Sequence, residues 1–390
     1  MSAGRRRRLA LVGLLATAVV GSLAAVVVAL GPRLAPLAGD LRSARGAPTP
    51  LARAGALDGR WVTPVTGWPA SIAADAAGAV VIAGRGEVRG LAPHGSTTWA
   101  TAVPGAGLYA PALDHDVVVV SAADRIVALD RVSGDARWEA GVAGGAGPVG
   151  VAGEAEDGDA VALAGTEAGE LLALDLATGV VRWSVRHPGA LRSPPVVDPG
   201  AGVVAATWHG GGTDRVRALD LATGVPRWEA TLAPFAAAPV VQRGLVIVAE
   251  GDGEGHARVV ARATGTGVEA WSSPVPSSFE SGIHPAAAGH DVAVVDHFGT
   301  VTLLDVGTGA RRWEAHLDRP VLRTDVLLTE RAVVLTTHPG GLVVLDRASG
   351  RVRGGGPRAG FPVGLARCGR LLLVALRLAE PGRVEAITLP

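Results

Sequence analysis

Few residues of this 390-residue chain have the types and the spacing that chemistry needs, and a glycine-rich segment is the first of them. Gly145, Gly147 and Gly150 match the spacing of a dinucleotide-binding loop, in which glycines let the backbone approach a pyrophosphate. Such a loop opens a helix, yet Pro148 lies inside the segment and no helical pattern follows it. We therefore interpret the segment as a loop that precedes a strand.

The histidines and the acidic residues do not form a recognisable ligand set either. None of the ten His is followed by a second one four residues later, and three are spaced by six and seven residues: His284, His290 and His297. We expect them to be solvent-facing loop residues. A short acidic run lacks the ligand order and the glycine of a calcium loop, so it predicts a solvated hairpin tip: Glu154, Glu156, Asp157 and Asp159. The sequence thus predicts no catalytic residue, no metal and no cofactor.

Missing residue types exclude further chemistry. The chain has no Lys and no Asn, so a phosphate-loop lysine and a Schiff-base lysine are both excluded. Its single cysteine, Cys368, excludes an intramolecular disulfide and a thiolate zinc cluster, and we expect it to be a buried structural thiol. Residues 1–50 carry a net charge of +6 and the remainder carries −6. A mildly acidic body argues against nucleic-acid binding.

The N-terminal segment predicts a membrane anchor. Residues 1–8 form a basic tail with four arginines at Arg5–Arg8, and the uncharged residues 9–30 would span about 33 Å as a helix, enough for a bilayer core. Arginines on one side place the N-terminus in the cytoplasm and the rest of the chain outside the cytoplasmic membrane. A cleaved signal peptide, and therefore a secreted protein, is the alternative. Residues 31–58 are rich in Pro, Ala and Gly and predict a semi-extended linker to a folded body over residues 59–390.

A repeat with a period near 42 residues dominates that body. Residues 173–183 read ALDLATGVVRW and residues 218–228 read ALDLATGVPRW, with related versions elsewhere and Gly354 where one Trp is expected. The residues that mark the repeat are Trp61, Trp99, Asp130, Gly134, Trp138, Asp175, Gly179, Trp183, Asp220, Gly224, Trp228, Gly267, Trp271, Asp305, Gly309, Trp313, Asp346 and Gly350. Short Val, Leu and Ala runs between these marks are typical of strands, so each repeat has the length of a four-stranded propeller blade.

One unit illustrates the expected blade. We expect its strands, from the axis outward, at residues 193–197, 202–207, 215–220 and 225–230. Asp and Thr oxygens can bond turn amides between the third and fourth strands, and the turn Gly can take a positive φ. The Trp of the outer strand is large enough to wedge between neighbouring blades.

The marks predict an all-β, eight-bladed β-propeller behind one transmembrane helix. After Gly354 three strands remain, at residues 362–366, 370–376 and 383–389, and the missing outer strand is available at residues 59–62. The last blade is then shared between the termini, which leaves no open edge in the ring. Seven blades are the alternative.

Asp and Gly at this spacing before Trp resemble the repeat of pyrroloquinoline-quinone (PQQ)-like propellers, over residues 59–390. That superfamily includes quinoprotein dehydrogenases and the non-enzymatic propeller lipoprotein of the outer-membrane assembly machinery. The enzymes carry calcium ligands that usually include Asn and a cysteine pair beside the quinone, and this chain has neither. The resemblance therefore favours the non-enzymatic branch.

We expect a membrane-anchored, extracytoplasmic scaffold that binds another protein or an envelope component without catalysis. A ligand-sensing ectodomain is the first alternative, and a PQQ-dependent dehydrogenase is a less favoured one. In a propeller the segments that enter the innermost strands lie near the axis, so their side chains are candidates for one binding funnel. These candidates are Trp68, Tyr109, Arg192, Phe235, Glu280, His284, Arg323 and Phe361.

Overall fold

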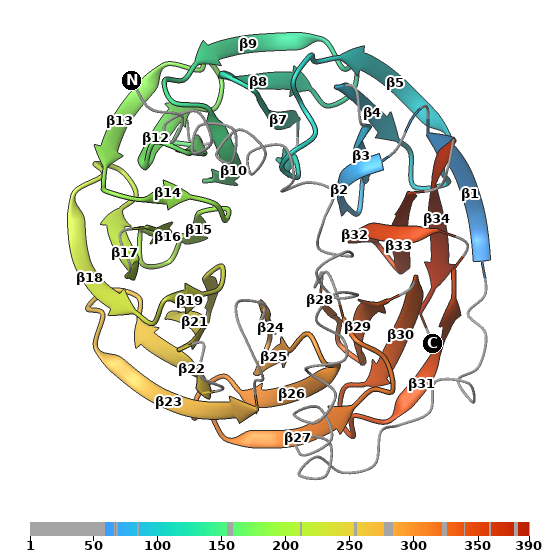
Figure 1. The fold of residues 1–390 in the computed structure, drawn as a ribbon. Coiled ribbons are helices and arrows are strands. Elements are labelled where there is room, and N and C mark those ends of the chain that lie inside the picture. Colours follow the sequence, from blue (N-terminus) through green and yellow to red (C-terminus); the bar gives the residue numbers. More distant parts are fainter. Residues whose placement is uncertain are drawn as a thin grey trace, which may run out of the picture. The chain divides into compact units, whose positions relative to one another are not determined.

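Eight antiparallel sheets form a ring in the computed structural model, which describes residues 59–65, 67, 69–83, 86–114, 116–153, 159–210, 213–252, 256–276, 284–321, 326–338, 340–358, 360–377 and 381–389 (Figure 1). Strands account for all the regular structure among these residues. No helix within them has the length and apolarity to cross a membrane. The predicted transmembrane segment, residues 9–30, and the linker, residues 31–58, lie outside the described part of the chain.

The first four blades follow the chain in order. Blade 1 contains β2 (Pro69–Asp75), β3 (Gly78–Ala83), β4 (Glu87–Leu91) and β5 (Thr97–Ala102). Blade 2 contains β6 (Ala112–Leu113), β7 (Val117–Ala122), β8 (Arg125–Asp130) and β9 (Ala136–Gly141). Blade 3 contains β10 (Ala146–Ala152), β11 (Val161–Thr166), β12 (Glu170–Asp175) and β13 (Val181–Arg186). Blade 4 contains β14 (Ala190–Leu191), β15 (Val196–Asp198), β16 (Val203–His209), β17 (Asp214–Asp220) and β18 (Pro226–Leu232).

The last four blades complete the ring. Blade 5 contains β19 (Phe235–Ala236), β20 (Val240–Gln242), β21 (Leu245–Gly251), β22 (His256–Ala263) and β23 (Glu269–Pro276). Blade 6 contains β24 (His284–Ala288), β25 (Asp291–Val295), β26 (Thr300–Asp305) and β27 (Arg311–His316). Blade 7 contains β28 (Val326–Leu328), β29 (Ala332–Thr337), β30 (Gly341–Asp346) and β31 (Val352–Pro357). Blade 8 contains β32 (Phe361–Cys368), β33 (Leu371–Arg377), β34 (Gly382–Thr388) and β1 (Gly59–Val65).

The eight-bladed ring with a shared last blade is confirmed, and seven blades are excluded. Strand β1 pairs antiparallel with β34, from Gly59 opposite Ile387 to Val65 opposite Gly382. The first described strand of the chain is therefore the outer strand of the last blade, at the place predicted from residues 59–62. All three C-terminal strands also lie where the sequence predicts them.

The innermost strand of blade 4 differs from its prediction. A continuous strand was expected over residues 193–197, but the structure has two short strands, β14 and β15, on either side of Pro194 and Pro195. Both pair with β16. Proline has no amide hydrogen and cannot donate to the ladder, so the pairing breaks where the two prolines stand.

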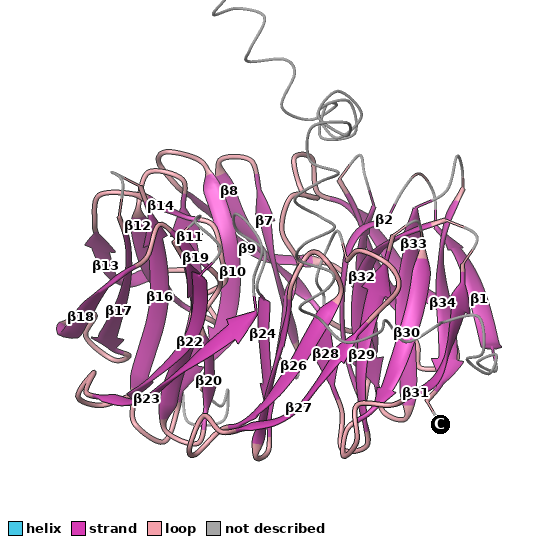
Figure 2. Cartoon of the chain, turned by 60° about the horizontal axis from the view of Figure 1, so that its bottom comes forward, coloured by secondary structure: helices cyan, strands magenta, loops and turns pink. Residues whose placement is uncertain are grey.

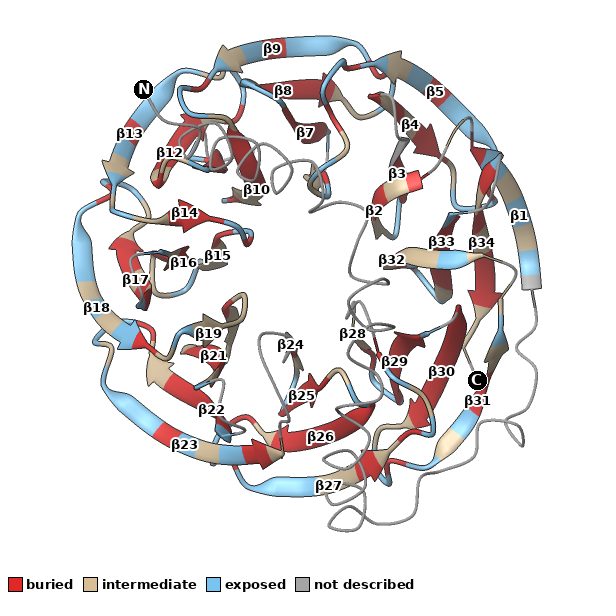
Figure 3. Cartoon of the chain, in the orientation of Figure 1, coloured by how far each residue is buried: buried red, intermediate tan, exposed pale blue. Residues whose placement is uncertain are grey.

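Burial follows the position of a strand in its blade. Strands β7 and β11 are buried at every residue, because blades cover both of their faces. The outermost strands β9 and β13 have a single buried residue each, Trp138 and Trp183. Figure 3 shows this change from buried inner strands to exposed outer strands. The apolar core therefore lies between the blades.

The turn between the third and fourth strands has the predicted chemistry. In blade 3, Asp175 Oδ1 accepts hydrogen bonds from the amides of Ala177 and Thr178 and from the Thr178 hydroxyl, at 2.8–3.1 Å. The turn glycine, Gly179, has a φ of +73°, which a residue with a Cβ rarely adopts. Equivalent Asp bonds hold the turns that begin at Asp130, Asp220, Asp305 and Asp346.

In these five blades an arginine completes the turn. It stands immediately before the Trp of the outer strand, or before Gly354 where that Trp is replaced, and its role was not predicted from the sequence. Each donates to the second oxygen of the turn Asp seven residues earlier: Arg137 to Asp130, Arg182 to Asp175, Arg227 to Asp220, Arg312 to Asp305 and Arg353 to Asp346. Bonds from the arginine and from turn amides or hydroxyls lower the pKa of the carboxyls of Asp130, Asp175 and Asp220 to about 2. These carboxylates stay charged at every physiological pH.

Each tryptophan locks its blade to the next one, as predicted. The ring lies flat on the turn glycine of the following blade, where an added Cβ would come within 2.5–2.7 Å of ring atoms. Its indole N–H donates to a carbonyl of the same turn, at 2.7–3.1 Å. The seven locks are Trp61 on Gly95, Trp99 on Gly134, Trp138 on Gly179, Trp183 on Gly224, Trp228 on Gly267, Trp271 on Gly309 and Trp313 on Gly350.

Gly354 replaces Trp at the one junction that has no turn to receive it. A lock from blade 7 would need a turn between the third and fourth strands of blade 8, which are β34 and β1. These strands come from opposite ends of the chain, so no turn glycine joins them. An apolar cluster that includes Val334, Val344, Leu372 and Val374 packs blades 7 and 8 together without such a lock.

The two ends of the blades carry different connections (Figure 2). We call one end the connection face. It carries the links between blades, such as residues 103–111 and 187–189, and the turns between second and third strands, such as residues 167–169 and 296–299. The opposite end, the hairpin face, carries the Asp turns and the turns between first and second strands.

Candidate functional site

Four of the eight predicted funnel residues have described side chains, and all four lie at the connection face. Tyr109 lies in the link before β6, Phe235 begins β19 and Phe361 begins β32. Arg192 lies between β14 and β15, inside the broken innermost strand rather than before it. His284 begins β24, but its side chain lies outside the described residues, as do Trp68, Glu280 and Arg323.

Tyr109 and Arg192 both interact with Glu167, a residue that was not predicted as part of the site. The Tyr109 hydroxyl donates to Glu167 Oε1 at 2.6 Å, and Arg192 Nε lies 4.0 Å from Glu167 Oε2. These residues belong to blades 2, 4 and 3. Burial and the bond to Glu167 raise the pKa of the Tyr109 phenol well above its ordinary value, so the hydroxyl remains a donor. Arg192 is 68% exposed and keeps most of its guanidinium in solvent.

A second cluster on the connection face surrounds Trp208, the described tryptophan that is not a repeat mark. Trp208 is 1% exposed and its indole donates to the Gly169 carbonyl at 2.9 Å, which ties blade 4 to blade 3. The ring of His187 lies 5.7 Å away and the guanidinium of Arg217 lies 5.8 Å from the Trp208 ring. In the sequence, Trp208 differs from the other tryptophans of the repeat only because it lies on a second strand and does not follow the repeat spacing. That difference was the one signal that could have pointed to this cluster.

Two buried carboxylates hold the link between blades 4 and 5. Glu250, 2% exposed, accepts hydrogen bonds from the amide of Ala233 and from Arg258 Nε, both at 2.6 Å. Asp214, 6% exposed, accepts one from the amide of Ala236 at 3.1 Å and lies 3.0 Å from His209 Nδ1. One of these amides lies in the link and the other in β19, so both carboxylates fix the shape of the connection face next to Phe235.

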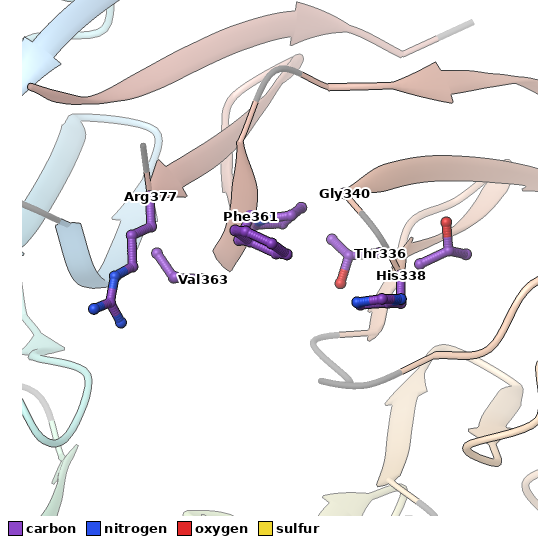
Figure 4. Close-up of a pocket in the computed structure, with 8 residues that line it drawn as sticks. Thr336, His338, Gly340, Phe361, Val363 and Arg377 are labelled. Atoms are coloured by element: carbon purple, nitrogen blue, oxygen red, sulfur yellow. The ribbon is translucent and has the colours of Figure 1, made fainter. Parts of the chain in front are cut away.

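A pocket of about 520 Å³ opens where blade 7 meets blade 8 on the connection face. It is lined by Thr336, Thr337, His338, Gly340, Phe361, Pro362, Val363 and Arg377. Figure 4 shows Phe361 between Arg377 on one side and His338 on the other. The Phe361 and His338 rings are 6.4 Å apart, and Phe361 is 57% exposed. Phe361 is thus a predicted funnel residue that lies in a formed pocket.

The other residues with possible chemistry have structural places. The Gly145–Gly150 segment was expected to precede a strand, but β10 begins at Ala146 and includes most of it, because these residues pair with β11. His297 was expected to face solvent, but it is half-buried and its Nδ1 lies 3.0 Å from the Val321 carbonyl. Of the acidic run, Asp159 is exposed and residues 154–158 lie outside the described part.

Family comparisons agree with this architecture. The family model described as outer membrane protein assembly factor BamB matches three overlapping segments of the chain: residues 54–206, 187–326 and 253–354. The chain belongs to this family of PQQ-like β-propellers. No curated protein matches the sequence.

Three solved structures show the fold that this PQQ-like propeller shares. BamB from Moraxella catarrhalis is 18% identical, with a TM-score of 0.68 over 85% of this chain and 100% of that one. The computationally designed protein Ika8 is 13% identical, with a TM-score of 0.67 over 86% and 98%. The quinohemoprotein alcohol dehydrogenase from Comamonas testosteroni is 13% identical, with a TM-score of 0.63 over 85% and 76%. At these identities the likeness establishes the fold.

The described residues of this PQQ-like propeller do not fit a quinone with calcium. No group of three or more His, Cys, Asp or Glu side chains within the described part could hold a metal ion. Cys368 is 3% exposed at the end of β32 on the hairpin face, and burial raises the pKa of its thiol. It is a buried thiol, as predicted, and the chain offers no second Cys to pair with it.

Proposed function

We propose that this BamB-like propeller is a non-catalytic binding or assembly scaffold whose connection face contacts another protein or an envelope component. The observation that carries this proposal is how the aromatic residues are distributed between the two faces of the ring. Seven tryptophans lock the blades near the hairpin face. Of the other described aromatic residues, Trp208 is buried at the end of β16, whereas Tyr109, Phe235, Phe298 and Phe361 lie on the connection face, with Phe298 and Phe361 exposed. Exposed aromatic side chains on varied loops are typical of protein-binding surfaces.

The polar groups of the connection face support a binding role rather than catalysis. Glu250 and Asp214 are occupied in holding backbone amides, and Glu167 joins Tyr109 to Arg192. These interactions give the face a fixed shape, which favours rigid docking of a partner. The description of the matching family also names an assembly factor.

Photocrosslinking tests the proposed face. A benzophenone amino acid replaces Leu108 or Phe298 on the connection face, which are 76% and 48% exposed, in cells that make the full chain. Matched controls carry it at Val132 or Val268 on the hairpin face, which are 81% and 67% exposed. We expect a common protein adduct from the two connection-face positions and none from the controls. Equal adducts from both faces, or adducts from the hairpin face alone, would refute the proposal.

We also propose that residues 9–30 anchor the protein in the cytoplasmic membrane with the propeller outside. The support is the uncharged 22-residue stretch that follows Arg5–Arg8. Protease added to intact spheroplasts should degrade the propeller, while a cytoplasmic marker protein survives. Protection of the propeller, or release of a soluble form that begins after residue 30, would contradict this proposal.

Quinone binding provides a direct check on the absence of catalysis. Full-length protein incubated with pyrroloquinoline quinone and calcium should keep no chromophore after gel filtration. A bound quinone in equal amount to the protein would favour the dehydrogenase alternative.

A further inference from the structure

The pocket between blades 7 and 8 is a built site with two fixed walls. One wall contains His338 and Gly340, between β29 and β30, where the His338 amide donates to the Pro320 carbonyl at 2.9 Å. The Gly340 carbonyl accepts from the Arg358 amide at 2.7 Å, which joins this turn to the link before blade 8. A Cβ on Gly340 would lie 2.5 Å from the Gly360 carbonyl oxygen, so only glycine permits this approach. These backbone contacts therefore fix this wall of the pocket.

The lining combines an apolar wall with a cationic end. Phe361, Pro362 and Val363 supply the apolar wall, and the 57% exposed Phe361 ring offers a surface for a second ring. Arg377 lies on the other side of Phe361 from His338 (Figure 4). None of the eight lining residues is acidic. A ligand with an aromatic group beside a carboxylate would match both the apolar wall and the cationic end of the pocket.

We propose that this pocket binds an extended peptide segment of a partner that carries an aromatic side chain next to an acidic residue. The aromatic side chain packs on Phe361 and His338, and the carboxylate faces Arg377. The inference rests on the proposed function, because it names the peptide chemistry that one part of the connection face accepts. The site is also at the single junction without a Trp lock, so a bound peptide bridges the two blades that lack one.

Calorimetry with purified full-length protein and three short blocked peptides tests the proposal. The sequences are Ala-Asp-Phe-Ala, Ala-Asn-Phe-Ala and Ala-Asp-Ala-Ala, each acetylated and amidated. We expect the first peptide to bind at least about fivefold more tightly than the other two. Phe361→Ala and Arg377→Met should each weaken it about fivefold or more. Matched substitutions elsewhere on the face, Phe298→Ala and Arg192→Met, should leave the affinity unchanged.

Thermal melts keep the result interpretable. A variant that melts at the wild-type temperature yet loses the peptide supports the site. Equal affinity for all three peptides, or unchanged affinity after Phe361→Ala, would overturn the inference. If no peptide binds while crosslinks from Leu108 and Phe298 persist, the inference fails and the scaffold proposal stands. If the peptide binds but no crosslinks form, the scaffold proposal fails instead.

Discussion

A double-mutant cycle at Trp183 and Gly224 measures one interblade lock. Trp183 is 8% exposed, its indole donates to the Leu221 carbonyl at 2.9 Å, and its ring lies on Gly224. Trp183→Ala empties a large aromatic site and should cost about 3–5 kcal/mol of unfolding free energy. Gly224→Ala should cost about 1–2 kcal/mol because its φ is +72°, and about 1–3 kcal/mol more because the new methyl meets the ring.

The double variant separates these two costs. Once Trp183 is Ala, the Gly224→Ala methyl no longer meets a ring, and only the backbone cost of about 1–2 kcal/mol remains. The two substitutions should therefore couple by about 1–3 kcal/mol. Urea unfolding followed by circular dichroism measures all three variants, with Val225→Ala as a control at an adjacent, 59% exposed position. Strictly additive costs would show that the ring does not rest on the glycine, and the lock would be refuted.

Three further predictions concern acid stability, ring closure and an interblade ion pair. The pKa of Asp130, Asp175 and Asp220 is lowered on folding to about 2, so their stabilisation is complete above about pH 4 and is lost as the pH falls towards 2; melting temperatures from pH 5 to pH 2 should fall more steeply for wild type than for the triple Asp→Asn variant. Deleting Gly59–Val62 removes the Trp61 lock and half of β1, and should lower the melting temperature as much as Trp183→Ala does. Arg347→Met removes bonds to the buried Asp291 and to two carbonyls, and should cost about 2–4 kcal/mol in urea unfolding, whereas the exposed Arg351→Met should cost little.

The blade architecture could be predicted because its chemistry is local in sequence. Asp175, Thr178 and Gly179 form one turn within five residues, and Trp183 follows four residues later. A repeat of such a short pattern fixes the number of blades and the positions of most strands. The three C-terminal strands leave blade 8 without an outer strand. Residues 59–62 could therefore be assigned to that position from the sequence.

The interactions that depend on pairing between distant residues could not be predicted. Arg182 reaches Asp175 only because the hairpin brings residues seven apart side by side, and the sequence shows both without showing the contact. Glu167 bonds Tyr109, 58 residues away, through the ring geometry of the blades. The pocket at Phe361 likewise depends on how the β29–β30 turn meets the start of β32. Sequence spacing placed Phe361 at the correct end of its blade but could not show its neighbours.

The two faces of the ring are subject to different physical requirements, and this difference points to the site of recognition. On the hairpin face, the same Trp and Gly contact recurs at seven junctions, so those residues are determined by closure of the ring and cannot distinguish partners. On the connection face, each link has its own side chains, and specificity can arise only from such differences. At the junction of blades 7 and 8, ring closure and partner recognition concern the same pair of blades. Gly354 leaves this junction without a Trp lock on the hairpin face, and the pocket opens at its connection face. A partner that binds there contacts the blade that closes the ring, so binding and ring stability should rise together.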